Sequence, residues 1–429
     1  MRKLWWVALA ALAVLVSACH NGGHSQNSTD MRAVNAVINS DPLDVLVAGD
    51  VKFTGLTYGS TSAFANFSSG GQEVTVRSTP THAIFFDKSL NFGDGATSTL
   101  VIFGSTSSIS ALQLADDITS PDTVPAAGNF KIRVVGASTD SGPVDLYVTP
   151  GTDLSNVPAT LGGVVLGAVS PYAETTAATY VLSLTIAGTK DLLFQSAPLS
   201  LSAGAIYSVI VLPSGGGKLS NALLLQQGQS GTGTLLSNPN GRVKAVNAIP
   251  DSTPLNFLAD NTPLLSNVPF AGASDYVPLA SGSHTLQLEA SNVPGSVITS
   301  LPVQVNPARD YTMVAVNSLA QAELIAFTDD NTAPPVGFAK LRFANALVGS
   351  AGTDVLVNFA TQTTNLAYKS ASSYYTFAPS TTYTITFTSP GGVSILATLS
   401  PAELDAAGVY TAYLLGTPSS PQIRLVRDR

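Results

Sequence analysis

The segment Thr382-Tyr383-Thr384-Ile385-Thr386-Phe387-Thr388 alternates polar and apolar side chains along its length. Because successive side chains of a β-strand point to opposite faces, this alternation predicts a strand with one buried face and one face in solvent. His284-Thr285-Leu286-Gln287-Leu288-Glu289 shows the same pattern. β-branched and aromatic residues are frequent in such runs, and turn clusters such as Ser389-Pro390-Gly391-Gly392 separate them. The chain is therefore predicted to form short strands joined by tight turns.

Four segments of the chain begin with one shared pattern: a basic residue, two small or apolar residues, Asn or Gly, and then Ala. The four openings are Arg32-Ala33-Val34-Asn35-Ala36, Arg133-Val134-Val135-Gly136-Ala137, Lys244-Ala245-Val246-Asn247-Ala248 and Arg342-Phe343-Ala344-Asn345-Ala346. Nine residues after the fourth position of each opening stands an Asp or Asn, namely Asp44, Asp145, Asn256 and Asp354. Each begins an apolar strand, so we interpret its side chain as an acceptor for a turn amide rather than as a catalytic group.

Aromatic residues recur at fixed distances in the same segments. One set lies 20 residues after the recurrent Asp or Asn in three repeats, and 27 residues after it in the second, which carries an insertion: Phe64, Tyr172, Tyr276 and Tyr374. Another set opens the last apolar strand of three repeats, with Ser98 in that place in the first: Tyr207, Tyr311 and Tyr410. We interpret this second set as core or corner tyrosines. Offsets that hold over four copies indicate internal repeats.

The density of strands predicts the fold class. About seven short strands fit into each repeat, which is typical of a two-sheet sandwich. We therefore predict an all-β chain of four tandem immunoglobulin-like β-sandwich domains of about 100 residues each. The Cys…Trp…Cys pattern of true immunoglobulin domains is absent from the repeats. The expected ranges are a signal peptide at 1–18, a lipidated cysteine and tether at 19–30, and sandwich repeats at 31–122, 129–228, 241–330 and 338–429.

The links between the repeats differ in composition. The first and third, at 116–128 and 329–337, are similar because each begins with two aspartates and continues into a proline-bearing stretch. The middle link, at 228–241, is rich in Gly and Ser instead. This alternation indicates that a two-domain unit was duplicated. We expect the proline-bearing links to stiffen each pair and the middle link to act as a hinge.

Three motifs of the second repeat carry a family resemblance. They are Pro143-Val144-Asp145-Leu146-Tyr147-Val148-Thr149-Pro150-Gly151, Gly167-Ala168-Val169-Ser170-Pro171-Tyr172 and Leu201-Ser202-Ala203-Gly204-Ala205-Ile206-Tyr207. They resemble the Asp-centred strand, the following turn and the last motif of the bacterial extracytoplasmic family catalogued as domain of unknown function 4397. The resemblance covers nearly all of 31–429, and the first repeat diverges most. It implies the fold and a location outside the cytoplasm. The family has no established activity, so the resemblance implies no chemistry.

The N-terminal segment has the layout of an export signal. Arg2 and Lys3 precede an uninterrupted apolar run of 13 residues, Leu4 to Val16. This run is shorter than the about 20 residues that a spanning helix needs, and it suits a signal peptide. It ends in Leu15-Val16-Ser17-Ala18-Cys19, which resembles the lipobox of bacterial lipoproteins. The resemblance implies cleavage before Cys19 and acylation of that residue, the alternative being an ordinary secretory signal. Cys19 is the only cysteine and has no disulfide partner in the chain.

The residues after Cys19 predict where the chain is held. His20 stands where an Asp usually retains Gram-negative lipoproteins at the inner membrane, so the resemblance implies the outer membrane. Residues 20–30 are polar and without periodicity, and as a flexible tether they span roughly 18 Å. The first domain is therefore expected close to the membrane, with the periplasmic and the surface face both left open.

Composition and motifs exclude several classes of function. Charged residues make up 11% of the chain, and the net charge of −8 comes without a basic cluster, which argues against nucleic-acid binding. Gly-x-Ser-x-Gly is absent, and the histidines are too dispersed for a triad or a zinc site: His20, His24, His82 and His284. Gly215-Gly216-Gly217-Lys218 lacks the first glycine of a phosphate loop, so we predict a hairpin turn there. We expect no catalytic residue and no cofactor.

Aspartates gather in the two similar links. They include Asp116, Asp117, Asp329 and Asp330. Hard cations such as Ca²⁺ take six to eight oxygen ligands, often from carboxylates. These links are therefore candidate calcium sites that would stiffen the chain, and solvated turn residues are the alternative.

These features together predict a membrane-anchored cell-envelope lipoprotein that acts as a non-enzymatic binding, adhesion or spacer module. Its partners are the membrane, through Cys19, and a protein or glycan. A structural subunit of an envelope assembly is the alternative. An envelope-polymer hydrolase is less favoured, because it would need two carboxylates about 5–9.5 Å apart in one cleft.

Overall fold

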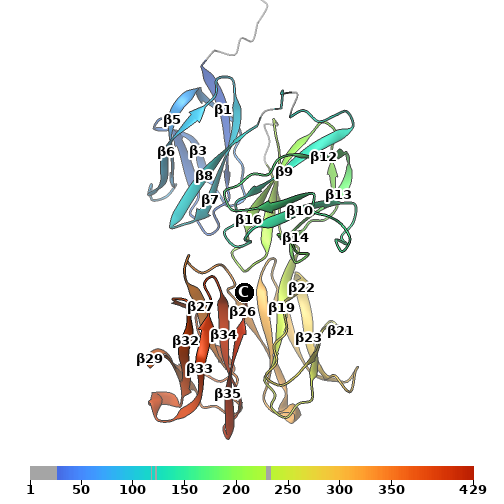
Figure 1. Cartoon of the computed structure of the whole chain (residues 1–429), viewed down its shortest axis with the longest axis vertical. Helices are drawn as coiled ribbons and strands as arrows, with labels where there is room; N and C mark the ends of the chain where they lie inside the picture. The colour runs from blue at the N-terminus through green and yellow to red at the C-terminus, as the bar shows by residue number, and fades with distance from the viewer. Residues whose placement is uncertain (1–26, 117, 121–122, 229–232) are drawn as a thin grey trace, which may run out of the picture.

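The computed structural model describes residues 27–116, 118–120, 123–228 and 233–429, which form four β-sandwiches and contain no α-helix. The predicted signal peptide and the predicted lipidation site Cys19 lie outside these residues. Figure 1 shows the sandwiches as two side-by-side pairs, one above the other. The prediction of an all-β chain of four sandwich domains is confirmed. Within the described ranges, no helix has the length and apolar character needed to cross a membrane.

Domain 1 consists of two four-stranded sheets. Its strands are β1 (Ser28–Asn35), β2 (Leu43–Val47), β3 (Asp50–Leu56), β4 (Ala65–Ser68), β5 (Gly70–Ser78), β6 (Ile84–Phe92), β7 (Thr97–Ser105) and β8 (Ser108–Ala115). We call the sheet that contains the first strand, β4-β1-β7-β8, the inner sheet, and β3-β2-β5-β6 the outer sheet. β1 and β7 run parallel in the middle of the inner sheet, whereas the other neighbouring strands are antiparallel.

Domains 2, 3 and 4 repeat this layout. Domain 2 holds β9 (Asn129–Gly136), β10 (Val144–Thr149), β11 (Leu161–Val164), β12 (Ala173–Thr176), β13 (Ala178–Ile186), β14 (Leu192–Gln195), β15 (Leu199–Leu201), β16 (Ile206–Pro213), β17 (Ser220–Gln226) and β18 (Thr234–Leu236). Domain 3 holds β19 (Asn240–Asn247), β20 (Leu255–Ala259), β21 (Thr262–Val268), β22 (Val277–Ala280), β23 (Gly282–Ala290), β24 (Val297–Val305), β25 (Asp310–Val316) and β26 (Glu323–Asp329). Domain 4 holds β27 (Ala339–Asn345), β28 (Thr353–Val357), β29 (Ala360–Leu366), β30 (Ser370–Ala371), β31 (Tyr375–Phe377), β32 (Ser380–Thr388), β33 (Ile395–Leu404), β34 (Val409–Thr417) and β35 (Ser420–Arg427).

The sheet orders show the common topology. The other inner sheets are β12-β9-β16-β17-β18, β22-β19-β25-β26 and β30-β27-β34-β35, with β31 also on β27. The other outer sheets are β11-β10-β13-β14 with β15 on β13, β21-β20-β23-β24 and β29-β28-β32-β33. Each first strand again runs parallel to a late strand, in the pairs β9·β16, β19·β25 and β27·β34. Each sandwich exceeds the about seven predicted strands: domains 1 and 3 have eight described strands, domain 2 has ten and domain 4 has nine.

The alternate side chains of β1 belong to two different cores. Met31 and Ala33 point into the sandwich of domain 1. Val34, and Ala36 just after the strand, point the other way, into an apolar cluster that the inner sheets of domains 1 and 2 build together. Because both faces of the central strands are buried, buried residues follow one another there without alternation, as Leu100, Val101 and Ile102 do in β7.

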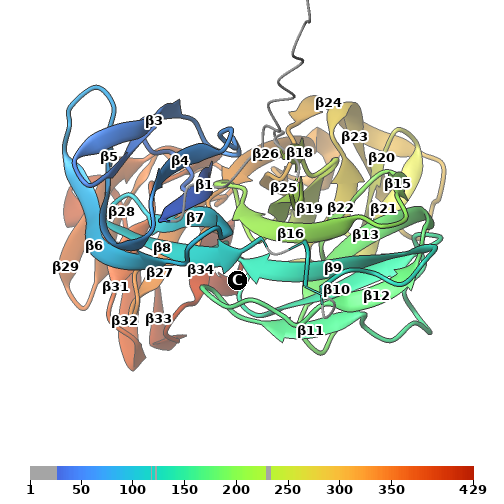
Figure 2. The ribbon, with the colours of Figure 1, turned by 90° about the horizontal axis from the view of Figure 1, so that it is seen from above.

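Such an interdomain cluster holds each pair together. Between domains 1 and 2 it consists of Val34, Ala36, Val101, Leu114, Val135, Ala137, Ile210, Leu212, Leu223 and Leu225. Between domains 3 and 4 it consists of Val246, Ala248, Val314, Val316, Ala344, Ala346, Tyr413, Leu415 and Val426. Figure 2, the view from above, shows the upper pair, domains 1 and 2, side by side in front of the lower pair. Apolar area removed from water stabilises at about 25 cal/mol per Å², so these contacts favour the paired state.

The two pairs meet end to end at the hairpin between β16 and β17. Gly216 and Gly217 lie against Arg309 and Asp310 of domain 3, so closely that a Cβ atom on either glycine would collide. Arg309 donates from Nη1 to the carbonyl oxygen of Gly215 at 2.6 Å. The hairpin turn predicted for this segment is confirmed by the pairing of β16 with β17.

The middle link, in which we expected a hinge, contains secondary structure. Its described part includes β18, which pairs with β17 of domain 2. Arg429 adds a bridge across the junction, because it donates to the carbonyl oxygens of Asn331 at 2.9 Å and of Asp140 in domain 2 at 2.6 Å. Residues 229–232 lie outside the described part of the chain. Bending at this link stays a prediction, and these bonds would have to break for it.

Replacing Ile210 with Ala tests how strongly the interdomain clusters stabilise the fold. Ile210 is fully buried between domains 1 and 2, so we expect Ile210→Ala to lower the free energy of unfolding by about 2–5 kcal/mol. Ile84→Ala is the matched control, since Ile84 is 62% exposed, and we expect it to cost under about 0.5 kcal/mol. Chemical denaturation followed by circular dichroism measures both. Equal costs would contradict a stabilising interface.

Candidate functional site

The recurrent tyrosines fix corners of the sandwiches. Each hydroxyl accepts the backbone N–H of the residue five positions earlier: Tyr207 from Ser202 at 3.2 Å, Tyr311 from Asn306 at 3.0 Å and Tyr410 from Asp405 at 2.9 Å. Their rings lie in the domain cores. The interpretation as core or corner residues is confirmed, and these tyrosines are structural.

The recurrent Asp and Asn residues at the strand starts also have structural partners. Each accepts backbone N–H groups from neighbouring turns and strand ends: Asp44 from Gly55, Asp145 from Gly163 and Gly188, Asn256 from Asn267, and Asp354 from Asn365 and Gly391. These bonds satisfy amides that the outer sheet leaves unpaired. The interpretation as acceptors for turn amides is confirmed.

A second constellation recurs between the paired domains, on the face of each inner sheet that points away from its own core. It joins the opening basic residue, the recurrent aromatic ring, a hydroxyl on the parallel strand and a polar residue at the C-terminal end of the last long strand of the sheet, either its final residue or the next one. The four sets are Arg32, Phe64, Thr99 and Asp116; Arg133, Tyr172, Ser208 and Gln227; Lys244, Tyr276, Thr312 and Asp329; and Arg342, Tyr374, Thr411 and Asp428. Each cation lies 4.8–5.1 Å from the centroid of its ring, a favourable cation–π distance.

In domains 3 and 4 the cations cross to the acid of the neighbouring domain. Arg342 of domain 4 pairs with Asp329 of domain 3, and Lys244 of domain 3 pairs with Asp428 of domain 4. Burial lowers the pKa of Lys244, but Tyr413, Asp428 and Asp329 outweigh it and hold that pKa above its usual value. Two carboxylates therefore offset the burial of two cations in this pair.

Domains 1 and 2 share one acid between two arginines. Asp116 lies 3.0 Å from Arg32 of its own domain and 3.7 Å from Arg133 across the interface. Gln227 takes the place of the second acid. Burial lowers the pKa of Arg32 despite the attraction of Asp116, and it raises the pKa of Asp116 despite both arginines. One carboxylate is thus not enough to offset the burial of this cluster.

The aspartates considered for calcium lie in different surroundings. Asp116 and Asp329 are the buried ion-pair partners of arginines, and Asp330 pairs with Lys340 at 2.9 Å. Asp117 lies outside the described residues. In the described ranges, no three His, Cys, Asp or Glu side chains gather in a way that would hold a metal ion. Calcium binding stays a prediction, which thermal unfolding with Ca²⁺ and with a chelator tests.

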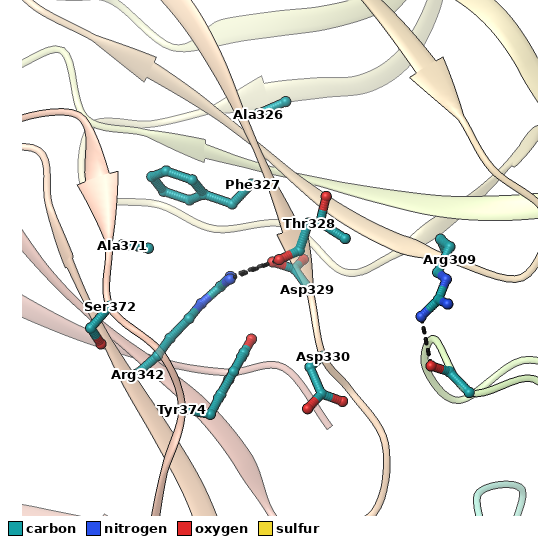
Figure 3. A pocket seen from close by; sticks show the side chains of 11 residues that line it. Arg309, Ala326, Phe327, Thr328, Asp329, Asp330, Arg342, Ala371, Ser372 and Tyr374 are labelled. Atoms are coloured by element: carbon teal, nitrogen blue, oxygen red, sulfur yellow. Dashed lines mark hydrogen bonds and ion pairs between the residues drawn. The ribbon is translucent and has the colours of Figure 1, made fainter. Parts of the chain in front are cut away.

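A recess of about 410 Å³ opens beside the ion pair of Arg342 and Asp329. Figure 3 shows Arg342 reaching Asp329, with the ring of Tyr374 next to it. The Tyr374 hydroxyl is buried, and the described chain offers it no hydrogen-bond partner. At the rim, Arg309 holds Gly215 of the junction (Figure 3). Both arginines of this recess are therefore engaged within the protein.

A larger cleft of about 780 Å³ lies between domains 2 and 3. Domain 2 lines it from the β13–β14 and β16–β17 hairpins, and domain 3 lines it near the start of its inner sheet. Its lining includes Lys190, Asp191, Leu192, Lys218, Arg242, Asp275 and Pro278. Its volume falls in the range typical of ligand sites.

Some charged side chains of this cleft have partners within the protein, and others have none in the described chain. Lys190 donates to the Tyr147 hydroxyl at 3.1 Å, and Arg242 forms a bidentate pair with Asp310 at 2.9 and 2.6 Å. Three further charged side chains have neither an ion pair nor a side-chain hydrogen bond within the described residues: Lys218, Asp191 and Asp275. These three residues could not be predicted from the sequence, because they come from separate loops of two domains and no spacing in the sequence connects them.

Comparison with known proteins identifies the family. The family model described as "Domain of unknown function (DUF4397)" matches four successive ranges, 29–147, 131–234, 241–351 and 339–429. The chain belongs to the DUF4397 family. The resemblance read from the repeat motifs is thereby confirmed, and the four matches follow the four sandwiches. No curated protein matches the chain.

Among solved structures, the DUF4397 chain matches a carbohydrate-binding module of family CBM26 from Eubacterium rectale, crystallised in complex with maltoheptaose. The two share 10% sequence identity and a TM-score of 0.15, over 47% of this chain and 98% of that one. At this TM-score the likeness supports no argument about ligand or mechanism.

Replacing Gln227 with Glu tests whether a second carboxylate would stabilise the interface between domains 1 and 2. We expect Gln227→Glu to raise the free energy of unfolding by about 1–3 kcal/mol, because a charged acceptor would then face Arg133. With its oxygen turned toward Arg133, the Gln227 amide already lies 2.7 Å from Nη2. Gln422→Glu on exposed β35 is the control, expected to stay within about 0.5 kcal/mol. Chemical denaturation gives both values, and a loss of stability in Gln227→Glu would contradict this expectation.

Acid denaturation tests the structural role of Asp44. Burial raises the pKa of Asp44, but hydrogen bonds from Thr79, Thr54, the Gly55 amide and Arg77 outweigh it and hold that pKa below its usual value. Such a group stabilises the fold above its unfolded pKa of about 3.9 and loses this effect as the pH falls through the lower folded value. Below about pH 4 the wild type should therefore lose stability more steeply than Asp44→Asn in denaturation curves. Parallel curves would contradict this.

Proposed function

We propose that this DUF4397 protein is a membrane-anchored, non-enzymatic binding module of the cell envelope that holds its partner in the cleft between domains 2 and 3. The observation that carries the proposal is the set of available charges at that cleft. Lys218, Asp191 and Asp275 face it without partners in the described chain, whereas the buried cations and carboxylates between the paired domains are engaged with one another. Polar groups left available in a recess of this size suit recognition of a ligand.

The surroundings of the cleft carboxylates favour binding over hydrolysis. Asp191 and Asp275 are exposed, whereas a carboxylic general acid needs a desolvated site that raises its pKa. Asp428 also borders the cleft, but it pairs with Lys244. An envelope-polymer hydrolase is therefore the less favoured function.

The anchor of the proposed module comes from the sequence. We propose that Cys19 carries the lipid and that the protein resides at the outer membrane, because His20 follows the cysteine. Two or three acyl chains exceed what stable anchoring requires. The expected tether is shorter than 20–30, because β1 already begins at Ser28. The polar residues between Cys19 and β1 would then keep domain 1 next to the membrane.

Substitution of Cys19 tests the anchor. We expect the wild type to incorporate labelled palmitate and to sediment with membranes, and Cys19→Ala to lose the label and leave the membrane pellet. Ser25→Ala in the tether is the control and should behave as the wild type. Retention of both label and sedimentation in Cys19→Ala would refute lipidation at this residue.

Site-specific crosslinking on intact cells tests the binding cleft. A photoreactive residue at position 191, inside the cleft, should form adducts, whereas one at position 51, on the exposed edge of the outer sheet of domain 1, should form few. Adducts would be detected as shifted bands and identified by mass spectrometry. Equal yields at both positions would count against the cleft as the binding site.

A further inference from the structure

Lys218 is held at the cleft by a turn that both domains fix. It follows Gly216 and Gly217, which are packed against domain 3, and it precedes the buried Leu219. The turn connects β16 and β17, whose pairing continues to its edge. The backbone of Lys218 is therefore set before any ligand arrives, which lowers the entropic cost of binding.

Lys218 is a half-buried cation without a countercharge. No carboxylate in the described chain approaches its ammonium group to ion-pair distance. Burial lowers the pKa of Lys218, and the nearby cations Arg242, Arg429 and Arg427 lower it further, while Asp191 opposes them from a distance. An unpaired, partly buried charge costs free energy. A ligand that brings a negative charge would remove this cost.

Two carboxylate side chains border the same cleft as Lys218. Asp191, on the β13–β14 hairpin, and Asp275, two residues before β22, are exposed and make no side-chain hydrogen bond in the described part of the chain. Ionised carboxylates only accept hydrogen bonds, so they suit ligands with hydroxyl donors. Leu192 and Pro278 add apolar surface to the same lining. The cleft thus offers one cation, two acceptors and an apolar contact.

We infer that the cleft between domains 2 and 3 binds a sugar that carries a carboxylate. Lys218 donates to the ligand carboxylate, and Asp191 and Asp275 accept hydrogen bonds from ligand hydroxyl groups. This inference rests on the proposed binding function and names its ligand class.

A carboxylate fits this cleft better than a phosphate. A doubly charged phosphate would be repelled by Asp191 and Asp275, which border the same space. Bidentate recognition of phosphate requires an arginine fork, and the fork of Arg242 is already occupied by Asp310. Lys218 supplies a single point charge, which a singly charged group neutralises. A hydroxyl-rich monocarboxylate therefore satisfies all three available side chains.

Calorimetry with matched ligands tests the inference. The probes are neutral oligosaccharides that end in a single galacturonate or glucuronate, the same oligomers with that acid as its methyl ester, which keeps the sugar and removes the charge, and inorganic phosphate. The protein is the full mature chain with Cys19→Ser, which keeps it in solution. We expect the acidic oligomers to bind at least about tenfold more tightly than the esters, since a charge-assisted hydrogen bond is lost in the esters.

Variants of Lys218 locate the binding site. We expect Lys218→Met to weaken binding of the acidic oligomers roughly 10- to 100-fold. Lys218→Arg should restore most of the affinity, and Lys88→Met, at an exposed position of domain 1, should change nothing. In the absence of ligand, Lys218→Met should melt at the same or a higher temperature than the wild type, because it removes an unpaired charge. A lower melting temperature would instead assign Lys218 a structural role and overturn the inference.

Three other binding results would contradict all or part of the inference. Equal affinity for acids and esters would overturn charge recognition and leave the proposed binding cleft in place. Binding of phosphate in preference to uronates, with the same dependence on Lys218, would overturn the assignment to a sugar acid. Failure of the wild type to bind any uronate would overturn the inference, while crosslinking from position 191 would still decide separately whether the cleft binds a partner.

Discussion

Each inner sheet has to bury two faces, one in its own sandwich and one against the neighbouring domain. β1 and the residue after it divide their side chains between these two cores, with Met31 and Ala33 on one side and Val34 and Ala36 on the other. An isolated domain would expose the second face to water, at a cost of about 25 cal/mol per Å² of apolar area. The stable unit is therefore the pair of domains, and the chain consists of two such units.

This constraint explains why charges lie between the domains. The opening basic residue of every repeat projects from the second face of the inner sheet, where water is excluded. It remains tolerable there because an aromatic ring and the polar residue at the end of the last long strand lie against it. The lower pair contains two acids for its two cations, and the upper pair has only Asp116. The charges of this constellation are thus balanced in the lower pair, whereas the upper pair has an excess of positive charge.

Much of the domain architecture is predictable from local pattern, because strand period and repeat spacing are properties of neighbouring residues. The outer-sheet strand around Phe387 alternates and was identifiable, and the acceptor roles of Asp44 and Asp354 follow from their place at a strand start. The second face of the inner sheet gives no such signal, because a strand buried on both sides does not alternate. For that reason Asp116 and Asp329 resemble solvated link residues in the sequence, although the fold buries them against arginines.

The cleft was even less predictable from the sequence, since Lys218 and Asp275 line the same space only because one pair of domains contacts the next. That end-to-end contact also determines the proportions of the molecule. The chain doubles back, so four sandwiches form two columns rather than a single file (Figure 1). The molecule is two domains long and two domains wide, which is half the length of four domains in a single row. In return, every sandwich packs laterally against the other domain of its pair through a buried apolar cluster.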